Sequence, residues 1–179
     1  MRVSVASTYE DPRAHAVRER YLGLYGGEGI PVPVEAIAED LLGLRIEERS
    51  DIECSGMLLP AEWRIVLNAS EAVSDAGHPI RRRRFTIAHE IGHWVCHVLG
   101  AEQVEPVYCR AVDLSSETDR TLEREANVFA AELLMPEPAV RATWAEIGDV
   151  AACATRFDVS PTAMQWRLFG FALVDQRPT

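Results

Sequence analysis

The sequence contains no lysine, because all eighteen of its basic residues are arginine. This absence excludes a lysine nucleophile and Schiff-base chemistry, and we attribute it to genomic base composition. No stretch reaches the ~18 consecutive apolar residues that a membrane-spanning helix requires. The first residues, MRVSVASTYEDPR, lack the apolar core of a secretory signal peptide, so we expect a cytoplasmic protein without membrane contact.

The sequence also has few cysteines, and its basic residues are outnumbered by acidic ones. The four cysteines (Cys54, Cys96, Cys109 and Cys153) form no close pair such as C-x-x-C, and without an export signal we expect reduced, buried thiols. The formal net charge of −10 disfavours a protein that binds nucleic acid over a broad face. With 179 residues, 47% apolar and 26% charged, the chain is typical of one globular domain.

Hydrophobic periodicity predicts an α+β fold. Helices are expected over residues 14–25, 34–42, 80–99, 119–135, 138–147, 150–157 and 161–169. Strands are expected over residues 44–48, 55–59 and 64–68, the last two forming a hairpin, whereas 101–116 reads as a loop. Asp149 and Ser160 are the expected N-caps of the last two helices.

The most informative motif is H-E-x-x-H, which begins at His89. On a helix His89 and His93 project from one face, and each can offer a nitrogen to one Zn²⁺. Glu90 can reach a water at the metal and act as general base. The alternative is a pair of ordinary solvated histidines, but the apolar neighbours of the motif indicate a buried helix whose histidines need partners.

A catalytic zinc site requires a third protein ligand and one open position. The metzincin pattern is excluded because Leu99 stands ten residues after His89. His97 continues the histidine row but lies ~6 Å further along the helix axis than His93, so a packed or ring-contacting histidine is favoured.

The segment EREANVFAAELLMP offers two carboxylates instead, Glu123 and Glu125. Spacing alone does not choose between them, and a solvated pair of glutamates is the ordinary alternative. Asn127 shares a helix face with Glu123 and is expected to accept the free ring N–H of a ligating histidine.

RFTIAHEIGHWVCH followed by EREANVFAAELLMP resembles the ImmA/IrrE family of metallo-endopeptidases, and the likeness extends over about residues 30–170. Four further segments also resemble the family pattern: PVPVEAIAEDLLGLRI, SGMLL, IVLN and ATRFDVSPTAMQWRL. The resemblance implies His89, His93 and Glu123 as metal ligands, Glu90 as catalytic base and Asn127 beside them. It also implies a zincin-like fold with helices packed on a small antiparallel-rich sheet.

Family members cut helix-turn-helix repressors, and some carry their own N-terminal helix-turn-helix domain. Because only about 30 residues precede the matching region, we expect a separately encoded, XRE-like repressor as substrate, whose loss derepresses stress or mobile-element genes. Zn²⁺ is the expected cofactor, with Mn²⁺ and Fe²⁺ as alternatives. The competing interpretation is a non-catalytic zincin-fold regulator or toxin–antitoxin component that binds protein or DNA. Tyr108, His97 and His78 are candidate oxyanion donors.

We expect a peptidase domain over residues 1–136 and a helical tail over residues 137–179. The tail resembles a helix-turn-helix unit, and Gln165 and Arg167 could reach base edges, although packing on the peptidase domain is favoured. The basic run Arg81–Arg84 is expected to be a solvated helical turn, with a patch for nucleic acid or an acidic partner as its alternative.

Overall fold

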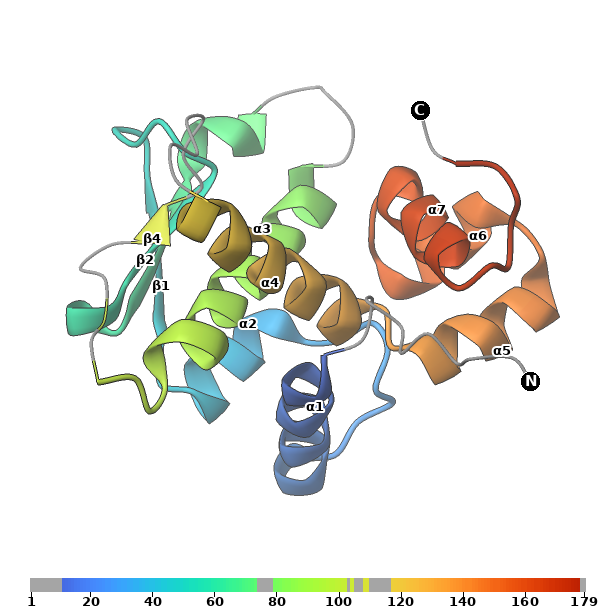
Figure 1. Ribbon diagram of the computed structural model, residues 1–179, viewed down its shortest axis with the longest axis horizontal. Helices are drawn as coiled ribbons and strands as arrows, with labels where there is room; N and C mark the ends of the chain where they lie inside the picture. Colours follow the sequence, from blue (N-terminus) through green and yellow to red (C-terminus); the bar gives the residue numbers. More distant parts are fainter. Residues whose placement is uncertain (1–10, 74–78, 103, 105–107, 110–116, 178–179) are drawn as a thin grey trace.

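The computed structural model describes residues 11–73, 79–102, 104, 108–109 and 117–177. It confirms a mixed α+β fold, with a small sheet at one side, α3 and α4 across the middle and α5–α7 at the other side (Figure 1). The α-helices are α1 (Pro12–Tyr25), α2 (Val34–Ala36), α3 (Pro79–His93), α4 (Glu117–Leu134), α5 (Glu137–Ile147), α6 (Val150–Phe157) and α7 (Pro161–Gly170). Shorter helical turns are η1 (Ile37–Leu41), η2 (Pro60–Glu62), η3 (Ala69–Val73) and η4 (Trp94–Val98). Among the described residues, no helix has both the length and the apolarity needed to cross a bilayer.

The sheet contains β1 (Arg45–Arg49), β2 (Gly56–Leu59), β3 (Arg64–Asn68) and β4 (Tyr108–Cys109), in the order β1-β3-β2-β4. The predicted hairpin is confirmed, since β2 and β3 pair antiparallel around η2. β1 pairs parallel with β3, and β4 pairs antiparallel with β2. The expectation of a loop throughout 101–116 was wrong at β4, a strand too short for side-chain alternation to reveal.

The core lies between the sheet, α3 and α4. Ile87 and Ile91 of α3 and Leu58 and Ile65 of the sheet are fully buried in one apolar cluster. α3 contacts both β2 and β3, and it also packs against α4 (Figure 1). Helix α3 therefore runs through the protein interior, as its apolar composition predicted, and it continues directly into η4.

Helices α5–α7 are joined to α4 through a buried ion pair. Arg167 of α7 pairs with Glu132 of α4 and donates from Nε to the carbonyl oxygen of Met135 at 2.8 Å. The suggestion that Arg167 could reach base edges was wrong, because its side chain is only 4% exposed and committed to α4. The predicted N-caps are confirmed: Asp149 accepts from the amide of Ala152, and Ser160 from that of Ala163. The expected boundary between a peptidase domain and a helical tail, at residue 136, falls between α4 and α5. This division into two parts stays a prediction.

Cys54 corrects the expectation that all cysteines are reduced. It is disulfide-bonded, whereas Cys96 and Cys153 are free. Every other cysteine is distant from Cys54 in sequence, so the bond depends on tertiary approach and has no local sequence signature. Burial raises the pKa of Cys96 to about 12, which keeps that thiol protonated and unreactive at neutral pH.

The contact between α3 and α4 is unusually close at Gly92. A Cβ atom placed on Gly92 would lie 3.0 Å from both the Cα and the carbonyl oxygen of Ala126, and 3.3 Å from Cβ of Phe129. Two of these atoms belong to backbone, which cannot move away as a flexible side chain can. The two helices can approach this closely only because position 92 carries no side chain.

We therefore expect Gly92→Ala to lower the free energy of unfolding by about 1–3 kcal/mol, the usual cost of overpacking. The matched control is Gly23→Ala in α1, where an added Cβ would meet nothing within 4 Å and helix propensity favours alanine by up to about 1 kcal/mol. Urea unfolding in a chelator separates this packing effect from metal binding. Equal stability of the two variants would contradict the close contact.

Candidate metal centre

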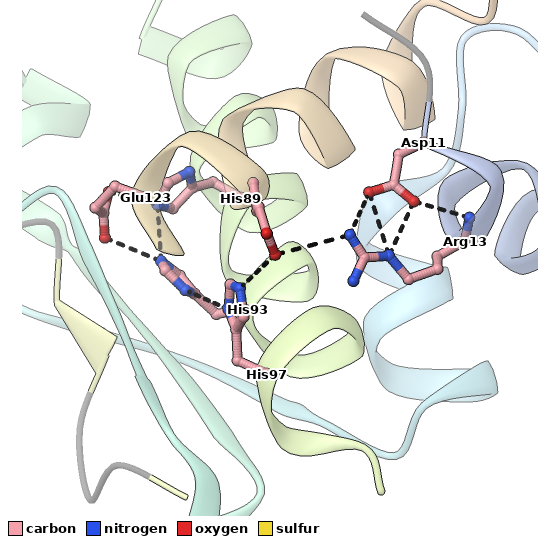
Figure 2. A network of polar contacts seen from close by, with 7 residues as sticks. Asp11, Arg13, His89, His93, His97 and Glu123 are labelled. Carbon is pink, nitrogen blue, oxygen red and sulfur yellow. Dashed lines mark hydrogen bonds and ion pairs between the residues drawn. The ribbon is translucent and has the colours of Figure 1, made fainter. Parts of the chain in front are cut away.

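Two histidines of α3 and one glutamate of α4 meet at a single point in the interior. The Nε2 atoms of His89 and His93 lie 3.1 Å apart. Oε1 of Glu123 is 3.1 Å from Nε2 of His93, and Oε2 is 3.2 Å from Nε2 of His89 (Figure 2). All three side chains are buried and together form a group able to hold a metal ion.

These separations fit a tetrahedral divalent metal. Ligands at ~2.0–2.1 Å from zinc stand about 3.3 Å from one another in a tetrahedral site, close to the observed spacing. Lone pairs on three donor atoms so close together repel each other unless protons or a cation lie between them. The chemistry of the donor set and its spacing therefore both suit a divalent metal.

Protonation states in the group also favour metal binding. Burial lowers the pKa of His93, which favours the neutral ring that can donate a lone pair. Burial alone would raise the pKa of Glu123, but its contacts with the imidazoles of His89 and His93 hold that pKa well below its usual range. The carboxylate of Glu123 is therefore ionised at neutral pH.

Glu90 follows the first histidine and is 1% exposed. Its carboxylate lies toward β2, since a Cβ atom on Gly56 would be 3.2 Å from Oε1 of Glu90 and 2.4 Å from Cγ2 of Thr86. A glycine at the start of β2 therefore leaves the space that the Glu90 side chain occupies between α3 and the sheet.

Glu123 and Glu125, the two candidates for the third ligand, have different surroundings. Glu123 meets His89 and His93, whereas Oε2 of Glu125 lies 3.2 Å from Nε2 of His97. Nδ1 of His97 is in turn 3.2 Å from Nδ1 of His93. His97 is thus not in the group of three but contacts one of its rings, in agreement with the favoured expectation.

This row of contacts is consistent with one set of tautomers. If Nε2–H of His97 donates to Glu125, its Nδ1 accepts from Nδ1–H of His93, which leaves the lone pair of His93 on Nε2 and directed at the metal position. Arg13 of α1 lies 3.9 Å from Glu125 and is itself held by Asp11 at 2.7 Å (Figure 2). Sequence analysis did not identify Arg13 or Asp11, because no local pattern indicates which element will cover a helix.

The three oxyanion candidates have different positions. Tyr108 is buried and stacks on His93, with ring centroids 5.0 Å apart and planes inclined by 30°. Both ring nitrogens of His97 are engaged, by His93 and by Glu125, which disfavours it as an oxyanion donor. His78 lies outside the described residues.

Asn127 is half-buried and lines a cleft together with Glu123. Nδ1 of His89 is buried without a hydrogen-bond partner among the described residues, and the contact of Nδ1 of His93 is His97. Neither ring nitrogen contacts Asn127 in this structure, so its predicted role stays a prediction.

The basic run Arg81–Arg84, which precedes the H-E-x-x-H motif, forms ion pairs within the protein. Arg81 and Arg84 both pair with Asp158, at 3.3 and 3.2 Å, and Arg84 also donates to the carbonyl oxygen of Val32 at 2.8 Å. Arg82 pairs with Glu71 at 2.9 Å, and Arg83 with Glu48 at 3.2 Å. The expectation of a merely solvated turn was wrong, because these arginines tie α3 to the surrounding elements.

Comparison with known proteins agrees with this geometry. The sequence profile of a peptidase family described as the IrrE N-terminal-like domain matches residues 59–169. The matched range contains the whole group of His89, His93 and Glu123, and it continues through α5 and α6 into α7.

Two individual proteins are similar to parts of this chain or to its fold. The "Radiation response metalloprotease IrrE" of Deinococcus radiodurans is 32% identical over 110 residues, which cover 59% of this chain but 31% of that protein. A "Mycobacterium tuberculosis transcriptional regulator" of known structure superposes with a TM-score of 0.57 at 18% identity, covering 96% of this chain and 50% of that one. The second likeness concerns the fold alone, and the chain spans about a third of the first protein's length.

The different surroundings of the two glutamates generate a test of the third ligand. We expect Glu123→Gln to weaken zinc binding by more than roughly 100-fold, because a ligand is lost, and Glu125→Gln by about tenfold, the usual effect of a group that orients a ligand. Competition with a chromophoric chelator measures both affinities. The opposite order of the two variants would identify Glu125 as the ligand.

Proposed function

We propose that this chain, which belongs to the peptidase family described as the IrrE N-terminal-like domain, is a zinc-dependent endopeptidase. The observation that carries the proposal is the convergence of His89, His93 and Glu123 in the interior, with Glu90 buried next to the first ligand. Two imidazoles and one carboxylate leave a tetrahedral metal with one open position, as catalytic zinc sites require.

In this proposal His89, His93 and Glu123 hold the zinc ion, although Mn²⁺ and Fe²⁺ also accept such donors. Zinc, when bound, supplies Lewis acidity that acidifies a water molecule and polarises a peptide carbonyl. Glu90 takes the proton from the attacking water and then delivers it to the leaving amine. The row formed by Arg13, Glu125 and His97 keeps the lone pair of His93 directed at the metal.

The substrate in this proposal is a protein, namely a separately encoded helix-turn-helix repressor of the XRE type. Its cleavage would derepress stress or mobile-element genes. Two observations support this substrate class: the resemblance to the ImmA/IrrE family, and the net charge of −10, which attracts a basic DNA-binding protein over long range. The printed description of the Deinococcus radiodurans relative as a radiation response metalloprotease is consistent with a stress role.

The direct test is Glu90→Gln in the zinc-loaded protein, incubated with the repressor encoded nearest to its gene. We expect the variant to bind zinc with unchanged stoichiometry but to cut the repressor at least 100-fold more slowly, because the general base is gone. Gel electrophoresis and metal analysis measure the two properties.

The control is Glu19→Gln on the exposed face of α1, which should cut at the wild-type rate. Wild-type cleavage by Glu90→Gln would show that Glu90 is not the base. Zinc binding by a wild-type protein that cuts no repressor would instead favour the alternative of a non-catalytic regulator with a zincin fold.

A further inference from the structure

A cleft of about 750 Å³ opens beside the metal ligands, between α3, α4 and α7. Glu123 and Asn127 lie in its wall, so the cleft borders one of the three candidate metal ligands. The same cleft reaches Ser160 and Trp166 at the start and on the outer side of α7. A peptide that approaches Glu123 from this side would lie in this cleft.

The charge of the cleft is opposite to that of the whole protein. Its lining contains five arginines and a single carboxylate, Glu123, which is expected to be occupied by the metal. The arginines are Arg81, Arg82, Arg120, Arg124 and Arg167. This concentration of arginines in a cleft next to the candidate site, on a chain of net charge −10, favours a negatively charged occupant.

Three of these arginines have partners within the protein. Arg81 pairs with Asp158, Arg82 with Glu71 and Arg167 with Glu132. These pairs neutralise most of the charge of the three side chains, which therefore contribute little attraction for an external anion.

Arg120 and Arg124 differ from the other three. They lie one turn apart on α4 and are exposed, and neither forms an ion pair with another residue that the structure describes. Their guanidinium groups can therefore bind carboxylates of an occupant through paired hydrogen bonds. Because Arg120 and Arg124 line the same cleft as Glu123, carboxylates bound by them would lie on the same side of α4 as that candidate ligand.

The rest of the cleft is largely apolar. Phe85 of α3, Val128 and Met135 of α4, and Trp166 of α7 contribute to its surface. Trp166 is 41% exposed, which is unusual for so large an apolar side chain. A surface that combines an apolar floor with two free guanidinium groups complements a peptide in which apolar and acidic side chains alternate.

We propose that this cleft binds an acidic segment of the protein substrate, and that Arg120 and Arg124 select it by pairing with its carboxylates. The inference rests on the proposed peptidase function, and it names the chemistry of the segment next to the cleavage site. A locally acidic segment is compatible with a substrate that is basic over its DNA-binding surface. Nucleic acid fits less well, because the floor of the cleft is largely apolar.

The test measures peptide binding by fluorescence anisotropy, using the zinc-loaded full chain with Glu90→Gln so that the peptide is not consumed. The probes are a fluorescein-labelled twelve-residue peptide of Asp, Glu, Leu and Ala, and the same peptide with Asn and Gln in place of its acids. We expect the acidic peptide to bind at least tenfold more tightly than the neutral one. Raising the salt concentration should reduce this preference.

The variant R120Q/R124Q should lose about tenfold in affinity for the acidic peptide and little for the neutral one. The matched control is R20Q/R156Q, which removes two exposed arginines outside the cleft and changes the net charge equally. It should bind the acidic peptide within twofold of the parent protein. Circular dichroism melting verifies that both variants are folded.

Equal binding of the two peptides, absence of binding, or an equal effect of the two double variants would overturn the proposal. Tighter binding of a labelled twelve-nucleotide single-stranded DNA than of the acidic peptide would also overturn it. Because anisotropy reports binding and not cleavage, the two proposals can fail separately. Wild-type protein that binds the acidic peptide through Arg120 and Arg124 but cuts no protein would refute only the peptidase function.

Discussion

The close contact between α3 and α4 at Gly92 is the constraint on which the site depends. Gly92 immediately precedes His93, and Ala126 lies one turn after Glu123, so this contact joins the two halves of the ligand group. A larger residue at position 92 would push α4 outward and carry Glu123 away from the histidines. The distances of 3.1–3.2 Å from the carboxylate of Glu123 to the two histidines therefore depend on how closely the backbones of α3 and α4 pack. A variant that kept the same donor residues but had a wider spacing between α3 and α4 would bind metal less tightly. The reason is that ligand positions must be held to within a few tenths of an ångström.

The arginines of this protein have two kinds of surroundings. Most form ion pairs within the fold. Arg81–Arg84 connect α3 to neighbouring segments, and Arg167 connects α7 to α4. Arg13 takes part in the contacts that orient His93. Arg120 and Arg124, beside the candidate metal centre, differ from these because neither forms an ion pair within the part of the chain that the structure describes. In a protein without lysine, the guanidinium group provides both structural cross-links and recognition, for which its planar array of donors is well suited.

Local sequence patterns predicted much of the fold. The helix over 80–99 is observed as α3 and η4, and the hairpin of β2 and β3 and the caps at Asp149 and Ser160 lie where expected. These features depend on residues that are neighbours in sequence, so periodicity and capping chemistry suffice to find them. Strand β4, described over Tyr108–Cys109, is defined by its pairing with β2, which no local pattern encodes.

Local patterns likewise predicted only the part of the candidate site that depends on residues close together in sequence. The helical repeat predicted that His89 and His93 share one face of a helix, whereas the meeting of both histidines with Glu123, and not Glu125, depends on the packing of α4 on α3. The contacts of His97 with Glu125, and of Glu125 with Arg13, join three separate elements and could not be read from spacing. The disulfide at Cys54 is likewise a tertiary feature.

We infer that two imidazoles and one carboxylate, from His89, His93 and Glu123, hold the metal. X-ray absorption at the zinc edge of the loaded protein tests it most directly, because it reports the donor atoms themselves. We expect nitrogen and oxygen donors only, at about 2.0–2.1 Å, with the scattering of two imidazole rings. A sulfur donor at about 2.3 Å, or a third imidazole from His97, would contradict it.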